Sequence, residues 1–320
     1  MGTQNIQKLL AVVICTYNGA AHLEEVIRAV LAQDGFEQYV QNVIVVDNKS
    51  TDETRAITER IVSESSAVEY QFEEQQGLAF ARRHAAKCKC QWVAFLDDDN
   101  IVFPGWLDAV ISTIEHNSRA GVINGAVIPM PNEAYTSQEK VMLQAFYRDL
   151  ACTHLTPADS DRNAGIGYPV GAGMCVLTAA LKKIDEDGWL KLVGRKGNIL
   201  LSGEDGEMAF RVKQQGYEFV YSPQIKLYHI IPPFRLTEEY LQRLLSGLVA
   251  DSYRYISMKP CYVLQRLLRV CKYVGQIMFC KAALPFTQDA VKQVQYHQKI
   301  INCRQFIQLA FQDKLTRRDV

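Results

Sequence analysis

The chain of 320 residues carries 35 basic and 35 acidic side chains, and 48% of its residues are hydrophobic. This length and composition suffice for a packed core in one large domain or two modest ones. The net charge of zero provides no long-range field for nucleic acid, so we expect no nucleic-acid partner, and any anionic ligand must be held by local groups.

The cysteines and the N-terminus favour a reduced, cytoplasmic setting. The nine cysteines are odd in number and form no CxxC pair. Cys88 and Cys90 could bind a metal, but no second Cys/His pair follows, and we expect them to fill space near a helix end. The opening MGTQNIQKLL lacks a signal-peptide pattern, and no segment reaches the roughly 18 apolar residues of a membrane-spanning helix.

The first half of the chain alternates short apolar runs with amphipathic stretches, a pattern typical of βαβ units and a mostly parallel sheet. Strands are predicted over LLAVVI ending at Ile14, Val43–Val46, Val68–Phe72 and Trp92–Leu96. Helices are predicted over Leu23–Leu31, behind the turn at Asp47, after Gly77 and from Pro104. Ser50 and Glu53 have the spacing of a capping box for the second of these helices.

Beyond Gly121 the alternation is less regular. The polar stretch from Thr153 to Gly167 is interpreted as a mobile loop over the site. A helix is predicted from about Glu204 to Gln215, with Gly216 as its left-handed cap, followed by two short strands, EFVYS and IKLYH.

From Leu236 to Val320 the apolar residues recur at helical spacing, and two interpretations stand. One is a helical subdomain that packs on the sheet or on another subunit, as in a homodimer. The other is an interfacial helix on anionic lipid, peripheral at the cytoplasmic face of the membrane, with Tyr262, Leu264, Leu267 and Leu268 near the boundary.

Three carboxylates, Asp97, Asp98 and Asp99, follow a strongly apolar predicted strand. Desolvation and mutual repulsion make this costly unless a cation is bound, and oxygen ligands of this kind suit Mn²⁺ or Mg²⁺ together with substrate phosphates. In an extended backbone Asp97 and Asp99 face one way and Asp98 the other. The alternative is a solvated acidic turn, but Asp47 also ends a predicted strand, where open α/β sheets bind ligands.

Six motifs in chain order resemble the inverting glycosyltransferases of family 2. They are VVICTYN from Val12, VVDNKSTD from Val45, GLAFARR from Gly77, FLDDDN ending at Asn100, GAGMCV from Gly171 and GEDGEMAFR from Gly203. The resemblance implies an α/β GT-A fold, Rossmann-like, with a mixed, mostly parallel sheet flanked by helices and a C-terminal helical extension. We divide the chain accordingly into a catalytic domain, 1–235, and a helical region, 236–320.

The resemblance also implies a donor site. Thr16, Tyr17 and Asn18 would line the pocket for base and ribose, and Asp47 would accept a hydrogen bond from the base, which favours an N–H-bearing base such as uracil. Further donor contacts are expected from Gly77, Arg82, Asp97, Asp98 and Gly173. Arg82 could instead be a solvated helix arginine, and Gly171 and Gly173 could instead form a tight turn. Lys49 departs from the glycine that is frequent in the family after Asp-Asn.

For the chemistry, the resemblance implies that Asp99 is the main metal ligand, with Asp97 and His229 as further ligands, while Asp97 or Asp98 approaches the sugar and ribose. His229 could equally be a plain hydrogen-bonded residue. Asp205 matches the general base that removes the proton of the acceptor hydroxyl, with Glu204 as its structural partner or as the base itself. The alternative for both acids is stabilisation of a helix N-terminus.

We therefore expect inverting transfer of a single sugar from a nucleotide-sugar donor, UDP-sugar favoured, to a hydroxyl of a glycan, lipid-linked or small acceptor. The QxxRW motif and multiple membrane spans of processive synthases are absent. A sugar nucleotidyltransferase is disfavoured because its GxGTRL-type opening is missing. A catalytically silent nucleotide-sugar-binding protein is the alternative of another class.

Overall fold

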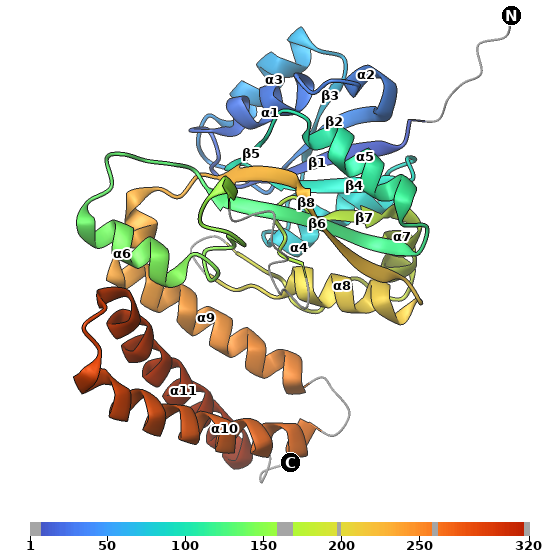
Figure 1. The fold of residues 1–320 in the computed structure, drawn as a ribbon. Helices are drawn as coiled ribbons and strands as arrows, with labels where there is room; N and C mark the ends of the chain where they lie inside the picture. The colour runs from blue at the N-terminus through green and yellow to red at the C-terminus, as the bar shows by residue number, and fades with distance from the viewer. Residues whose placement is uncertain (1–7, 159–168, 197–199, 258–261, 317–320) are drawn as a thin grey trace, which may run out of the picture. The chain divides into compact units, whose positions relative to one another are not determined.

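The computed structural model describes residues 8–158, 169–196, 200–257 and 262–316 (Figure 1). The chain forms two compact units. The first comprises Met1–Met130, Ala151–Asn198 and Glu204–Ile231, and the second Pro131–Leu150, Ile199–Gly203 and Pro232–Val320. The second unit thus takes in segments that precede residue 235, and a functional division of the chain at that residue stays a prediction.

The first unit is built on an eight-stranded sheet of order β3-β2-β1-β4-β7-β6-β8-β5. Its strands are β1 (Leu10–Thr16), β2 (Val40–Asp47), β3 (Val68–Phe72), β4 (Trp92–Asp97), β5 (Asn100–Val102), β6 (Ala120–Pro129), β7 (Cys175–Leu177) and β8 (Glu218–His229). Neighbours among β1 to β4 pair in parallel, as do β6 and β8, whereas β7 is antiparallel to β4 and β6, and β5 to β8. The predicted α/β fold with a mixed, mostly parallel sheet is confirmed.

Helices cover both faces of this sheet, which explains why β1 is buried along its whole length and reads as a continuous apolar run. Side chains of α4 (Leu78–Arg83), η1 (His84–Lys87), α7 (Thr178–Glu186) and α8 (Glu204–Gln214) pack in one buried cluster with one face of β1, and Cys88 and Cys90 fill space there as predicted. On the other face lie α1 (Leu23–Leu31), α3 (Thr54–Glu64) and α5 (Trp106–His116) (Figure 1). The short α2 (Phe36–Tyr39) leads into β2.

The register of the parallel strands places polar residues at one edge. Thr16 pairs with Asp47 across β1 and β2, and Cys15 pairs with Asp97 across β1 and β4. The carboxyl ends of three adjacent strands therefore carry Thr16, Asp47 and Asp97 side by side, the position where open α/β sheets bind ligands.

The predicted capping box of Ser50 and Glu53 is wrong. The helix α3 begins one turn later, at Thr54, and its N-cap Glu53 makes no side-chain cap hydrogen bond. The Ser50 hydroxyl instead accepts a hydrogen bond from the Asn18 N–H, and Asp52 accepts one from the Thr54 N–H. The polar residues before α3 are thus used to fix the loops at the sheet edge.

The two strands predicted over EFVYS and IKLYH are one strand, β8, which continues through Pro223. The missing N–H of the proline is tolerated because the pairing with β6 shifts register between Asn124 and Ala126. Gly125 lies at that shift, where an added Cβ would meet the Ile225 carbonyl oxygen at 2.0 Å.

The prediction of a mobile loop that begins at Thr153 is also wrong for the first residues of that stretch. Thr153 is buried, its N–H donates to the Val127 carbonyl at 2.8 Å, and its hydroxyl accepts from the Val127 N–H at 2.9 Å. His154 is buried beside it. Residues 159–167 of the predicted loop lie outside the described part of the chain.

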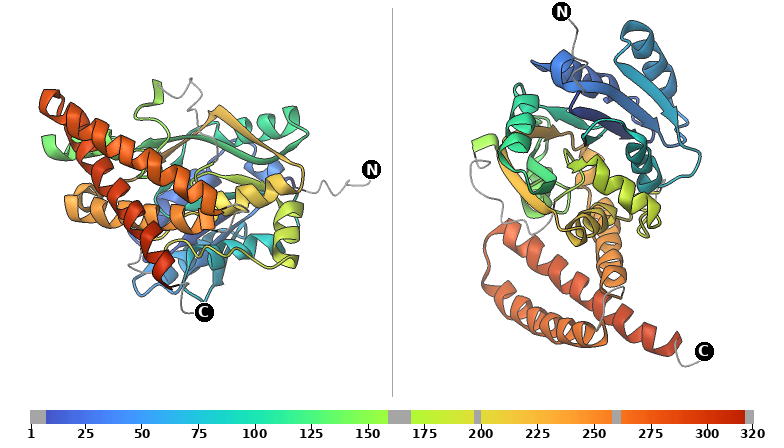
Figure 2. Two further views of the ribbon diagram at one scale, coloured as in Figure 1. Left: turned by 90° about the horizontal axis from the view of Figure 1, so that it is seen from below. Right: turned by 90° about the vertical axis from the view of Figure 1, so that its right-hand side faces the viewer.

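The second unit is helical, as predicted for the C-terminal region. Its elements are α6 (Ser137–Phe146), η3 (Pro233–Leu236), α9 (Glu238–Ser257), α10 (Tyr262–Ala283), η4 (Leu284–Phe286) and α11 (Ala290–Thr316). In Figure 2, α10 and α11 run side by side. Phe306 of α11 is buried between Tyr253 and Tyr273, with edge-to-face ring contacts at 5.5 and 4.8 Å. No described helix is long and apolar enough to cross a bilayer, and the cytoplasmic location stays a prediction.

Candidate active site

The loop between β4 and β5 separates the three adjacent aspartates. Asp98 turns toward the end of β1, where its Oδ2 accepts hydrogen bonds from the Thr16 hydroxyl at 2.6 Å and the Tyr17 N–H at 3.3 Å. An added Cβ at Gly19 would lie 2.2 Å from that oxygen, so glycine is required for this close approach. Thr16, Tyr17 and Asp98 are therefore brought together as one end of the site.

Asp99 turns the other way, toward β8. Its Oδ2 lies 3.3 Å from His229 Nε2, because Asn100 and His229 are paired across β5 and β8. Burial alone would lower the pKa of His229, but the charge of Asp99 and the hydrogen bond to it raise that pKa to about 10. The predicted partners Asp99 and His229 are thus adjacent, and Cys152 Sγ lies 3.8 Å from the other imidazole nitrogen.

Asn100 is a site residue that the sequence analysis left without a role. It is fully buried, its amide donates to Asp99 Oδ1 at 3.0 Å, and its Oδ1 accepts from the Asp97 N–H at 3.1 Å. In the sequence, the signal for such a role is a polar residue that stands between the acidic run and the apolar pair Ile101 and Val102. Asn100 fixes the turn that directs Asp97 and Asp99.

Asp97 and Asp99 supply the carboxylate oxygens that divalent cations such as Mg²⁺ prefer. Partial burial raises the pKa of Asp97, Arg82 opposes that rise, and the nearby negative charge of Asp99 adds to it. A cation would relieve this repulsion. No group of three or more His, Cys, Asp or Glu side chains among the described residues is arranged as a metal site, but Mg²⁺ is commonly bound by one or two carboxylates together with substrate phosphates.

Arg82 is buried at the centre of the site, with 1% of its surface exposed, so the alternative of a solvated helix arginine is wrong. Its Nη1 donates to Glu204 Oε1 at 2.9 Å, and its Nη2 lies 3.7 Å from Asp97 Oδ1. Arg82 Nε and Glu204 Oε2 are buried without a hydrogen-bond partner among the described residues. A contact between Arg82 and a donor stays a prediction.

Glu204 and Asp205, the first residues of α8, differ in environment. Glu204 is 4% exposed, and burial and then the neighbouring charge of Asp205 raise its pKa to about 7, against the effect of Arg82. Asp205 is half-buried, and its two oxygens accept hydrogen bonds from the Gly171 N–H at 2.9 Å and the Gly206 N–H at 2.7 Å. These two bonds fix the orientation of the Asp205 carboxylate.

Two positions in the turn before β7 have no room for a side chain, which explains why they are glycines. An added Cβ at Gly171 would lie 2.3 Å from Arg82 Nη2, and one at Gly173 would lie 2.4 Å from Leu227 Cδ2. Gly173 also has a φ of +69°, in the left-handed region that favours glycine. Both glycines therefore have a packing role, and a donor contact of Gly173 stays a prediction.

Two residues predicted to contact the base, Asp47 and Asn18, lie near the end of β2. Asp47 is 2% exposed, and its two oxygens accept from the Ser50 N–H at 2.8 Å and the Tyr70 hydroxyl at 2.9 Å. Asn18 faces the same loop, since its Oδ1 accepts from the Thr51 N–H at 2.8 Å. Lys49 adopts a φ of +69°, so the backbone keeps the left-handed turn although the residue is not glycine.

Asn48 is a second residue that the sequence analysis missed. Its amide donates to the carbonyls of Glu73 and Gln75, at 3.3 and 2.8 Å, and its Oδ1 accepts from the Gly77 N–H at 2.8 Å. Asn48 thereby holds the connection from β3 to Gly77, the N-cap of α4, and so positions the helix that carries Arg82.

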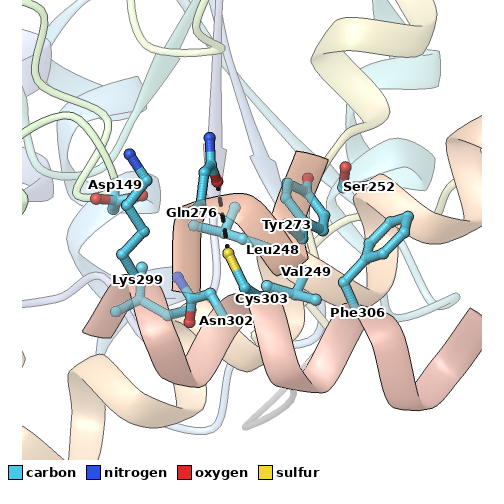
Figure 3. Close-up of a pocket in the computed structure, with 11 residues that line it drawn as sticks. Asp149, Leu248, Val249, Ser252, Tyr273, Gln276, Lys299, Asn302, Cys303 and Phe306 are labelled. Carbon is cyan, nitrogen blue, oxygen red and sulfur yellow. Dashed lines mark hydrogen bonds between the residues drawn. The ribbon is translucent and has the colours of Figure 1, made fainter. Parts of the chain in front are cut away.

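A cavity of about 210 Å³ lies elsewhere, within the helical unit (Figure 3). Phe306, Leu248 and Val249 form its apolar part, and Asp149 and Lys299 lie at its polar side. Burial raises the pKa of Asp149 to about 6. None of the predicted site residues lines this cavity.

An α/β sheet of this kind, with its acids gathered at one edge, is the architecture of the GT-A glycosyltransferases, which take a sugar from a nucleotide-sugar donor. The sequence pattern of Glycosyl transferase family 2 matches residues 11–171, and that of Glycosyl transferase family group 2 matches residues 92–290. The chain belongs to glycosyltransferase family 2.

Two relatives from Haloferax volcanii are similar over most of the chain. Glucosyl-dolichyl phosphate glucuronosyltransferase is 23% identical over 239 residues, which cover 72% of this chain and 72% of the relative. Glycosyltransferase AglE is 25% identical over 227 residues, covering 70% of this chain and 68% of the relative.

Solved structures share the fold. The mannosyltransferase PcManGT from Pyrobaculum calidifontis, in complex with GDP-Man and Mn²⁺, has a TM-score of 0.59 at 15% identity, covering 95% of this chain and 86% of that one. GalNAc-T7 with UDP, GalNAc and Mn²⁺ has a TM-score of 0.50 at 18% identity, covering 81% of this chain but only 52% of its own. S. aureus TarS 1-349 with UDP-GlcNAc has a TM-score of 0.50 at 16% identity, covering 93% and 81%.

Proposed function

We propose that this glycosyltransferase transfers a single sugar from a UDP-sugar to an acceptor hydroxyl, with inversion at the anomeric carbon. The observation that carries the proposal is Arg82, whose guanidinium reaches Glu204 at the start of α8 and Asp97 at the end of β4. The buried guanidinium thus links Glu204, next to the proposed base Asp205, to Asp97, in the acidic run that is proposed to bind the donor.

Asp205 is proposed as the general base. Its carboxylate is partly accessible and is oriented by two backbone N–H groups, whereas Glu204 is buried against Arg82. A carboxylate in this position can take the proton of the acceptor hydroxyl as its oxygen attacks the anomeric carbon from the face opposite the leaving diphosphate, which inverts the configuration. Glu204 is proposed to hold Arg82 in place.

Asp99, Asp97 and His229 are proposed to hold Mn²⁺ or Mg²⁺ together with the donor diphosphate. His229 would release its proton as the metal binds, since only a neutral imidazole can be a ligand. The cation would supply charge stabilisation for the departing nucleotide diphosphate. Asp98, held by Thr16, is proposed to contact ribose or sugar hydroxyls. The structural neighbours with bound Mn²⁺ favour a metal at this edge of the fold.

For the donor base, the proposal rests on Asp47, because a carboxylate can accept a hydrogen bond from the N–H of uracil. For the acceptor, a glycan, a lipid-linked sugar and a small hydroxyl compound remain the three classes. The dolichyl phosphate in the name of one relative favours the lipid-linked class.

The test compares Asp205→Asn with Asp185→Asn, a matched change at a surface carboxylate of α7 that pairs with Arg83. Asp205→Asn should lower kcat by about 10²–10⁴ with donor affinity nearly unchanged, because it removes the base and keeps the shape. Asp185→Asn should leave kcat within twofold. Loss of donor binding in Asp205→Asn would instead assign Asp205 to the donor site.

The stereochemical part is tested separately, by NMR of the first product formed from an α-linked UDP-sugar. A β-linked product agrees with inversion, and an α-linked product contradicts it.

A further inference from the structure

The outward face of α10 is apolar along its described length. We call the following set the α10 stripe: Leu264, Leu267, Leu268, Val274, Met278 and Phe279, whose side chains are 44% to 68% exposed. At about 100° per residue the six positions fall within an arc of about 140°, which places them on one side of the helix. Phe286, in η4 directly after α10, is 88% exposed.

Single exposed apolar side chains are ordinary on protein surfaces, but a continuous row of them is not. The inward side of the same helix is already used, since Tyr273 packs on Phe306 and Cys280 is buried. The α10 stripe is therefore not needed for the core of the helical unit, and its size and continuity indicate a surface that meets something apolar.

The charges of α10 indicate which apolar partner this is. The helix carries four basic and no acidic residues. Arg266 and Arg269 turn inward, toward the Tyr253 and Ser252 hydroxyls of α9. Lys272 and Lys281 are exposed, and the helical rotation of about 100° per residue places them about 80° and about 100° to either side of the line through Leu264.

We propose that the α10 stripe lies on an anionic lipid surface, with its apolar side chains below the headgroups and Lys272 and Lys281 at the phosphates. Lysines at both borders of an apolar face suit this arrangement, because their stems cover apolar surface while their ammonium groups reach the headgroups. A second copy of the chain fits less well, since two α10 faces would oppose lysines to lysines with no carboxylate on either helix.

The proposal goes beyond the transferase activity, because binding to a lipid surface requires neither donor nor acceptor. If the acceptor is lipid-linked, the stripe would also confine the enzyme to the surface that holds its substrate.

The experiment is co-sedimentation of the full chain with vesicles, without nucleotide or metal. The vesicles contain phosphatidylcholine alone or equal parts of phosphatidylcholine and phosphatidylglycerol. The double variant Leu268→Glu with Phe279→Glu should lose at least about tenfold in partitioning to the mixed vesicles, because two apolar contacts are removed. The variant Lys272→Gln with Lys281→Gln should lose the preference for mixed vesicles. Ile301→Glu, at a 45% exposed position of α11, is the matched control and should bind as the wild type does.

Circular dichroism shows that each variant is folded before binding is compared. The proposal is overturned if the wild-type chain does not bind mixed vesicles, or if Ile301→Glu loses as much binding as the stripe variant. It is also overturned if sedimentation shows a dimer that the stripe variant dissociates while vesicle binding is unaffected.

Discussion

Arg82 joins two segments of the candidate site through one buried charge. A guanidinium with 1% exposure is tolerable only because Glu204 and Asp97 neutralise it, and these acids in turn would be costly without it. The ion pair joins residues 122 positions apart, which is why the motif GLAFARR indicated an arginine of interest but not its partner.

Replacement of Arg82 by Met should therefore be strongly destabilising. Removal of one partner leaves buried acids uncompensated, and we expect the free energy of unfolding to fall by about 3–5 kcal/mol. Arg83→Met is the matched control, because Arg83 is half-exposed and pairs with Asp185 at the surface; it should cost less than about 1 kcal/mol. Urea unfolding with chelator present measures both, and equal losses would contradict the central role of Arg82.

The loss in Arg82→Met should grow as the pH rises above neutrality. In the wild-type chain burial raises the pKa of Glu204 to about 7, and removal of the Arg82 charge raises it further. Above pH 7 the wild-type Glu204 is ionised, while the folded variant still holds a proton that its unfolded state has lost. The folded variant thus binds more protons than its unfolded state, and its stability falls with pH. A constant difference between pH 6 and pH 8.5 would exclude Glu204 as the group left uncompensated.

At the scale of elements, periodicity predicted the long parts of the sheet and failed for the short ones. Uninterrupted apolar runs predicted β1, β2 and β4 because these inner strands are covered by helices on both faces. The edge strand β3 was predicted from VEYQF, in which apolar and polar residues alternate. The strands β5 and β7 have three residues each, too few for any period to appear. The two strands predicted on either side of Pro223 form the single strand β8, whose pairing with β6 shifts register opposite this proline.

The turn that precedes β7 provides a prediction at this scale. Gly173 and Gly188 both have a positive φ, +69° and +89°, but only Gly173 has a neighbour, Leu227, in the space of an added Cβ. Both alanine variants pay a similar backbone cost, and Gly173→Ala adds an overpacking cost of about 1–3 kcal/mol. Thermal unfolding should show the larger loss for Gly173→Ala. If Gly188→Ala lost as much, backbone conformation alone would explain the glycine.

At the scale of the whole molecule, the candidate site is assembled from residues between Thr16 and His229. In the sequence, the only indication that these residues belong together was the order of the short motifs that contain them. The sheet register explains part of this convergence, since it places Thr16, Asp47 and Asp97 at adjacent strand ends. The buried amides of Asn48 and Asn100 were not recognised, because an asparagine in a loop motif has the same appearance whether it is solvated or holds two neighbouring segments together.

Because a donor would bind only the folded chain, in which these segments come together, its binding should raise the melting temperature. With UDP and Mn²⁺ at about 100 times the dissociation constant, binding adds about 2.7 kcal/mol, which for a chain of this length corresponds to a rise in Tm of roughly 4 °C. The shift should largely disappear with chelator and in Asp99→Asn, because the diphosphate then meets Asp97 without a cation between them. Asp108→Asn, at an exposed position of α5, should keep the full shift. A UDP shift that is the same with and without chelator would exclude a metal-bridged donor, and a larger shift with GDP would overturn the assignment of uracil to Asp47.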